Sequence, residues 1–192
     1  MHRKAAPAMT PSGVPPIPKR MSLPDSGQAV EMAPQQAGTH YQLGNAYWSL
    51  SMWDAAREQF RAELANDPGN CLAQWKLGNI VLEQRGDPAE ALASVQRALD
   101  HCPNLMSARV DRARALVKLD RPAEAVSDLD AAEKAEPAEP STHFLLAQAY
   151  RALGKTQESQ AEMKLFSKLE EGARAATAER ARQLLQEKEK QP

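Results

Sequence analysis

Several kinds of residue are scarce in this sequence of 192 residues, and each scarcity excludes a class of protein. Aromatic residues make up only 5% of the chain, while helix-forming Ala, Leu, Glu, Gln, Arg and Lys dominate after about residue 37, which disfavours a strand-rich fold. The formal net charge is only −1, which removes the electrostatic basis for binding nucleic acid or an anionic membrane. No run approaches the roughly 18 consecutive apolar residues that a membrane-spanning helix needs.

Cysteine is equally scarce, since the chain contains only Cys71 and Cys102. Two cysteines are too few for a disulfide framework; the sequence permits one bridge between them but favours two free, partly buried thiols. Together with His101 they offer no fourth metal ligand, so we expect no metal and no other cofactor. The basic residues at the N-terminus are not followed by the apolar segment of a signal peptide, so we expect a cytoplasmic protein.

Proline is concentrated at the start of the chain. Residues 1–36 contain seven of the 14 prolines and show no helical period of apolar residues. Because proline blocks helix interiors and favours extended geometry in the preceding residue, we expect a disordered or polyproline-like leader. The segment 14–18, Val-Pro-Pro-Ile-Pro, has the composition of a ligand for a proline-recognition groove, although a linker is the simpler interpretation.

An internal repeat begins at about residue 37, and three independent markers keep its period. Small residues recur at intervals of 34 or 35 in two series, and prolines recur at the same interval in a third. The series are Gly44, Gly78, Ala113 and Ala147; Ala56, Ala91, Ala125 and Ser159; and Pro68, Pro103 and Pro137. Each period splits into two amphipathic runs, such as 40–50 and 54–65, which predicts a pair of helices per repeat. The second helix of the second repeat has a marked start, with Asp87 as the cap and Pro88 at the first helical position.

This pattern resembles the tetratricopeptide repeat family, whose units are helix-turn-helix pairs of about 34 residues. The first unit carries the resemblance best, with Leu43-Gly44, Tyr47, Ala56, Phe60 and Pro68 at the family spacing. The resemblance implies an all-α fold, a superhelical solenoid of four repeats at about 37–70, 71–105, 106–139 and 140–170. We expect residues 171–192 to form a capping helix and tail, with Ala178, Ala181, Leu184 and Leu185 on one face.

The sequence offers no chemistry-bearing motif. It contains no phosphate loop, dinucleotide fingerprint, His-Glu-x-x-His or Cys-x-x-Cys, and no nucleophile stands beside a base. His40 and His143 occupy equivalent places in two repeats, which favours a packing role, because catalysis needs one converging site. We therefore predict that the chain is not an enzyme.

The resemblance places a peptide-binding groove on the first helix of each repeat. Projected onto this sequence, the groove has a ladder of polar side chains, four aromatic anchors and two further residues. They are Asn45, Asn79, Arg114 and Gln148; Tyr41, Trp48, Trp75 and Phe144; and Leu82 and Arg151. The same projection adds Val110, Val117 and Lys118 from the third repeat. Trp75 and Asn79, midway along the array, are the expected centre of binding energy.

These features favour a non-enzymatic scaffold that binds a protein or peptide partner. The alternative is an auxiliary segment of a larger enzyme or cell-envelope assembly whose active part lies elsewhere.

Overall fold

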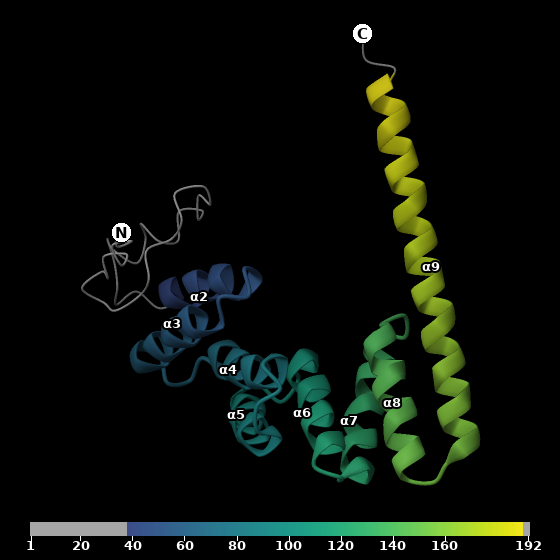
Figure 1. Ribbon diagram of the computed structural model, residues 1–192. Coiled ribbons are helices and arrows are strands. Elements are labelled where there is room, and N and C mark those ends of the chain that lie inside the picture. Colours follow the sequence, from purple (N-terminus) through teal and green to yellow (C-terminus); the bar gives the residue numbers. More distant parts are fainter. Residues whose placement is uncertain (1–37, 190–192) are drawn as a thin grey trace, which may run out of the picture. The chain divides into compact units, whose positions relative to one another are not determined.

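The computed structural model describes residues 38–189, and these residues form eight helices and no strand (Figure 1). In chain order they are α2 (Thr39–Ser49), α3 (Trp53–Asn66), α4 (Cys71–Glu83), α5 (Pro88–His101), α6 (Met106–Lys118), α7 (Pro122–Ala135), α8 (Pro140–Ala152) and α9 (Thr156–Glu189). Each repeat of the sequence thus supplies two helices, as predicted. The expected leader, residues 1–36, lies outside the described residues. None of the described helices is both long and apolar enough to cross a membrane.

The described residues divide into two compact units, of which the first comprises residues 38–86 together with 93–103. Within it α3 packs against both α2 and α4. Apolar side chains from these three helices form one core, with Phe60 at its centre. The small residues that the repeat pattern places at helix contacts are buried there, as Gly44 on α2 and Ala56 on α3. This agrees with their role of allowing close approach between helices.

The second unit comprises residues 87–92 and 104–189. Here α7 packs against α6 and α8, and α8 also contacts α6 and α9. Ala113 and Ala125 are fully buried in its core beside Leu116, Leu129 and Leu146, so the small-residue positions serve the same purpose in both units. The predicted start of α5 is confirmed, because Pro88 is its first residue and the Asp87 carboxylate accepts a hydrogen bond from the Ala89 backbone N–H at 2.9 Å.

The two cysteines form a disulfide, so the expectation of free thiols was wrong. Cys71 is the first residue of α4 and Cys102 directly follows α5, and their Cα atoms lie 6.0 Å apart. Two helices that run as a hairpin bring the start of the first beside the end of the second. A sequence separation of 31, almost one full repeat, is the spacing that this geometry requires.

The turn between the two helices has the same conformation in all four repeats. The second residue after the end of the helix is left-handed each time: Ser51 (φ 56°), Arg85 (φ 54°), Asp120 (φ 57°) and Gly154 (φ 73°). The next N–H donates to the carbonyl five residues earlier, at 2.8–2.9 Å, in the pairs Met52–Tyr47, Gly86–Val81, Arg121–Leu116 and Lys155–Tyr150. This is the Schellman motif, which satisfies backbone carbonyls at a helix end and usually has glycine at the left-handed position.

Only the fourth repeat has glycine there, so three of the four turns carry the conformational cost of a side chain at positive φ. Replacing Arg85, which is exposed, by Gly is expected to raise the free energy of unfolding by about 0.5–1 kcal/mol. Gly154→Ala, the reverse change at the equivalent turn, should lower it by about 1 kcal/mol. Urea unfolding followed by circular dichroism measures both variants, and a less stable Arg85→Gly variant would contradict this assignment of the turn.

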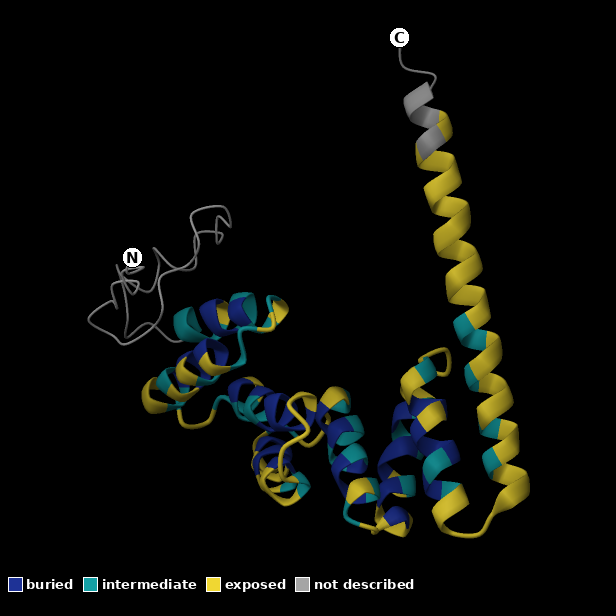
Figure 2. Cartoon of the chain, viewed as in Figure 1, coloured by how far each residue is buried: buried dark blue, intermediate teal, exposed yellow. Residues whose placement is uncertain are grey.

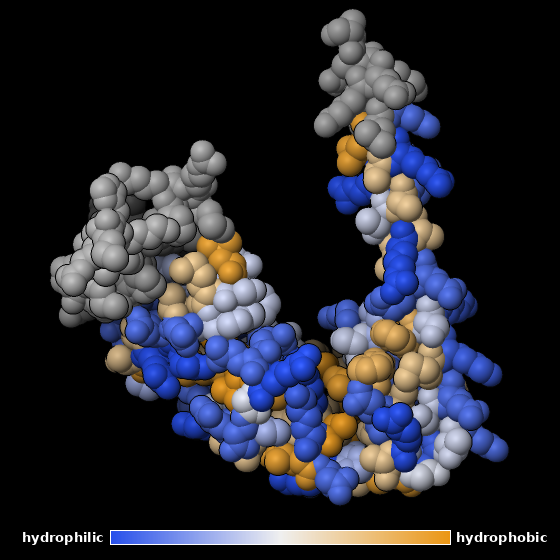
Figure 3. All heavy atoms as spheres, in the orientation of Figure 1, coloured by the Kyte–Doolittle hydropathy of each residue, from blue (hydrophilic) through white to orange (hydrophobic). Residues whose placement is uncertain are grey.

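The C-terminal helix differs from the predicted capping helix. The second helix of the fourth repeat does not end near residue 170, because α9 continues without a break to Glu189. Residues 171–184 are all exposed, so they cover no apolar surface of the fourth repeat (Figure 2). The side chains of this part are mostly hydrophilic, with alanines between them (Figure 3). Since the segment lacks proline and is rich in helix formers, local propensity suffices to extend the helix.

Candidate functional site

In the first unit, the predicted aromatic anchors contact a lysine of their own chain. The Lys76 ammonium lies 3.5 Å from the ring centroid of Trp48 and 4.6 Å from that of Trp75, in cation–π geometry. The indole N–H of Trp48 donates to Oδ1 of Asn79 at 2.9 Å, and Asn79 is only 8% exposed. Trp48 and Asn79 therefore stabilise the joint between α2 and α4. Asn79 is therefore buried, which corrects the expectation that it is open to a ligand, whereas Trp75 is half-buried and its role in binding stays a prediction.

The other predicted positions of the first unit are mainly structural as well. Leu82 is 1% exposed, so its placement on the groove surface was wrong and its side chain belongs to the interior. Tyr41 packs against Phe60, with ring centroids 5.8 Å apart, and its backbone N–H donates to the buried carboxylate of Glu63. Asn45 is half-buried on α2. Helical geometry explains the error at Leu82, because a shift of one residue turns a side chain by 100° about the helix axis.

In the second unit, α6 and α8 line an open pocket with a volume of about 410 Å³. It combines an apolar floor with polar and charged side chains. The lining residues are Val110, Asp111, Arg114, Val117 and Lys118 from α6, and Ser141, Phe144, Leu145 and Gln148 from α8. Three predicted groove residues, Arg114, Phe144 and Gln148, are thus brought together.

A separate, more open hollow of about 440 Å³ lies along α9. That hollow is lined by Gln160, Met163, Lys164, Ser167, Lys168 and Glu171, all from one helix. The α6–α8 pocket is the better candidate site because two helices enclose it and because it combines apolar and charged side chains.

Charges in the α6–α8 pocket are arranged in a definite way. The carboxylate of Asp111 is nearly buried and lies 4.0 Å from the Arg114 guanidinium. Lys118 is exposed one helical turn further along α6. The pocket thus has two cations and one anion, and the anion already lies beside one of the cations. A ligand carboxylate near Lys118 and Arg114 would be attracted, whereas one placed over Asp111 would be repelled.

Phe144 is the most prominent apolar side chain of the pocket. It is 40% exposed, and its ring packs against Phe166 of α9 with centroids 5.3 Å apart. Arg151, the remaining predicted groove residue, is exposed on α8 but does not line the pocket. The projection from sequence also found Val110, Val117 and Lys118. It missed Asp111, Ser141 and Leu145, although the i,i+3 spacing of Asp111 and Arg114 was a signal for an ion pair.

The two helices of a repeat are joined by a polar side-chain contact that recurs at equivalent positions in three of the four repeats. His40, Arg109 and His143 occupy equivalent positions near the start of the first helix in three repeats, and each contacts the residue 19 positions later. The pairs are His40–Gln59 (2.7 Å), Arg109–Asp128 (3.9 Å) and His143–Glu162 (2.8 Å). The inference that His40 and His143 have packing roles agrees with these contacts. Their partners were missed, although a polar residue at the fixed spacing of 19 could have identified them.

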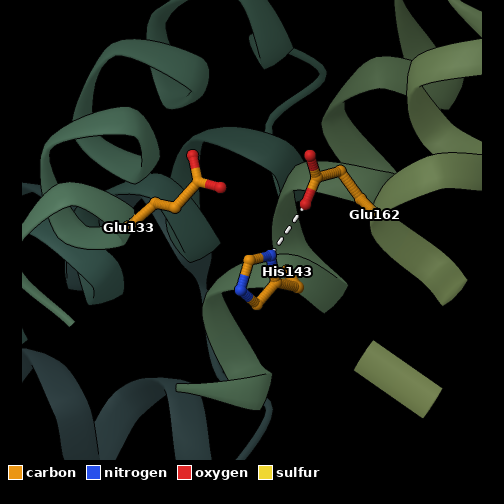
Figure 4. Close-up of side chains that lie close together, drawn as sticks. All are labelled: Glu133, His143 and Glu162. Atoms are coloured by element: carbon orange, nitrogen blue, oxygen red, sulfur yellow. Dashed lines mark hydrogen bonds and ion pairs between the residues drawn. The ribbon is translucent and has the colours of Figure 1, made fainter. Parts of the chain in front are cut away.

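The fourth repeat adds a second carboxylate to this contact. His143 is on α8, Glu162 on α9 and Glu133 on α7, and the acceptor and donor atoms of the three side chains all lie within 4.8 Å of one another (Figure 4). The second ring nitrogen, Nε2, lies 2.9 Å from the Pro137 carbonyl oxygen. Both ring nitrogens of His143 are therefore engaged in hydrogen bonds.

A comparison with protein families shows the family of the chain. The family model described as "Tetratricopeptide repeat" matches residues 41–105 and 110–162, which together are more than half of the sequence. The chain belongs to the tetratricopeptide repeat family. A comparison with curated proteins gave no match.

Solved structures of tetratricopeptide repeat proteins share the fold. A crystal structure of MamA is 17% identical, covers 78% of this chain and 87% of its own, and superposes with a TM-score of 0.65. The structure of YrrB, described as a TPR protein with an unusual peptide-binding site, is 21% identical, covers 75% and 74%, and has a TM-score of 0.62. These likenesses, with the helices of the described residues, show an all-α superhelical repeat fold.

Proposed function

We propose that this chain is a non-enzymatic interaction scaffold that binds an extended peptide segment of a partner protein in the α6–α8 pocket. The observation that carries the proposal is the pocket itself, in which an exposed aromatic ring stands beside two cations and an amide. Membership of the family supports a role in protein interaction, and the peptide-binding site named for YrrB supports a peptide as the ligand.

The lining residues define which peptide fits. Phe144, Val110 and Val117 suit one apolar side chain of the ligand, which would supply most of the binding energy by leaving water. The Gln148 amide can donate to a backbone carbonyl and accept from a backbone N–H, so it would hold the main chain without reading its sequence. Lys118 favours an acidic residue next to the apolar one. Nothing in this chemistry calls for a nucleic acid or a cofactor.

The disulfide favours a location of this scaffold in the cell envelope, one of the alternatives that the sequence leaves open. Disulfides form and persist in oxidising compartments and are rare in the reducing cytoplasm. The Cys71–Cys102 bond therefore weighs against the cytoplasmic location that the sequence led us to expect. In this setting the chain would present a partner to the rest of the assembly, and the α6–α8 pocket would keep its role.

Phe144→Ala is expected to weaken peptide binding at least tenfold, the effect of removing an aromatic anchor at the centre of a binding site. Peptides selected from a display library against the full chain provide the ligand, and fluorescence polarisation measures the dissociation constant. Leu153→Ala is the matched control, because Leu153 is 38% exposed, close to the 40% of Phe144, but lies outside the pocket.

Two further measurements separate binding from folding. Circular dichroism should show the same helical content in both variants, because Ala is a strong helix former, although Phe144→Ala removes the ring contact with Phe166. Lys118→Glu should weaken acidic ligands more at low salt than at high salt, whereas Lys134→Glu on α7 should not. Equal affinities of the Phe144→Ala and Leu153→Ala variants would exclude the pocket as the binding site.

A further inference from the structure

The side chain of His143 is enclosed by hydrogen-bond acceptors. It is 2% exposed; its Nδ1 lies 2.8 Å from Oε2 of Glu162, and its Nε2 lies 2.9 Å from the Pro137 carbonyl oxygen. Figure 4 shows the carboxylates of Glu133 and Glu162 above the ring, one from α7 and one from α9. These two are the charged groups that the neighbouring helices bring to the ring.

The geometry requires a proton on each ring nitrogen. A carbonyl oxygen and an ionised carboxylate can only accept, whereas a neutral imidazole carries a single N–H. As long as Glu162 is ionised, both hydrogen bonds of His143 can exist together only when the ring is the imidazolium cation. The equivalent contact of the first repeat has no such requirement, because the amide of Gln59 beside His40 can either donate or accept.

We propose that Glu133, His143 and Glu162 form a proton-controlled latch that holds α9 against α8. The latch is closed while the ring carries its positive charge between the two carboxylates. When the ring loses a proton, either the bond to Pro137 or the bond to Glu162 is lost, and a carboxylate is left partly buried without its cation. The protonation state of one side chain thus sets how firmly the last helix of the array is attached.

The direction of the pH effect follows from the surroundings of the ring. Burial of His143 lowers its pKa, but the hydrogen bonds to Pro137 and Glu162 and the charges of Glu162 and Glu133 outweigh burial, so the pKa is raised above the ordinary value. The latch therefore contributes fully below the unfolded pKa, about 6.5, and its contribution is lost as the pH rises through the folded pKa. Tyr150 on α8 also has a raised pKa, through burial and nearby carboxylates, and stays neutral over this range.

The test is hydrogen exchange of the full chain at pH 6 and pH 8.5, expressed as protection factors so that the intrinsic pH dependence cancels. Protection of residues 156–170 of α9 should fall by roughly threefold or more between the two pH values. Glu162→Gln, which reproduces the amide of the first repeat, should abolish most of this difference. His40→Gln is the control and should leave it unchanged.

Three results would overturn the latch. Protection of α9 that does not depend on pH is the first, and an undiminished pH dependence in Glu162→Gln is the second. The third is a pH dependence that disappears with EDTA and returns with Zn²⁺, which would replace the proton by a metal ion. NMR titration of the ring provides an independent readout that needs no variant, because the pKa of His143 should lie above the ordinary value for histidine.

Discussion

Reduction of the Cys71–Cys102 disulfide is expected to lower the free energy of unfolding of the first unit by about 2–4 kcal/mol. The bond closes a loop with a sequence separation of 31 and joins the start of α4 to the end of α5, so its loss releases the unfolded chain from a long-range constraint. Tryptophan fluorescence in a urea titration measures the effect selectively, because Trp48, Trp53 and Trp75 all lie in the first unit.

The Cys71→Ser/Cys102→Ser double variant is the control for this experiment. It should match the reduced protein in stability and should not respond to a reductant. Alkylation of the thiols in intact cells before lysis shows whether the bond exists at the site of function. Equal unfolding midpoints with and without reductant, or thiols that are fully alkylated before reduction, would contradict the role assigned to the disulfide.

Phe60→Ala is expected to cost about 3–5 kcal/mol, the largest effect of a single substitution in the first unit. The side chain is fully buried, and its ring fills the space that Gly44 leaves between α2 and α3. A Cβ atom on Gly44 would lie only 2.7 Å from the nearest carbon of that ring. Gly44→Ala should therefore destabilise the unit as well, by about 1–3 kcal/mol, through overpacking.

A double-mutant cycle tests this contact directly. The cavity left by Phe60→Ala can accept the new methyl group of Gly44→Ala, so the double variant should lose less stability than the sum of the two single variants. Urea unfolding followed by tryptophan fluorescence provides all four free energies. Additive losses would show that Gly44 and Phe60 do not pack against each other as the structure has them.

The repeat and its helices could be predicted because they rest on local signals. Gly44, Ala56 and their equivalents mark helix contacts at a fixed period, and Asp87-Pro88 marks a helix start. The continuity of α9 was missed because the repeat period places the end of the fourth unit near residue 170, although no proline interrupts the helix-forming residues that follow. The Cys71–Cys102 bond depends on how two helix ends meet in space.

The candidate site was predicted less completely than the fold. The family register found Arg114, Phe144 and Gln148 because an exposed helix face follows from periodicity alone. It could not show that Lys76 lies beside Trp48, since that contact depends on the packing of two helices. The partners of the two histidines were missed for the same reason, although their common spacing was present in the sequence.

Hydrogen exchange of the full chain with and without a selected peptide tests most directly whether the α6–α8 pocket is the binding site. Bound peptide should increase protection in residues 110–118 of α6 and 141–148 of α8, the segments that line the pocket. Phe144→Ala should remove this increase at the same peptide concentration. Protection confined to residues 41–82, or to the proline-rich segment 1–36, would contradict the account and place recognition elsewhere on the chain.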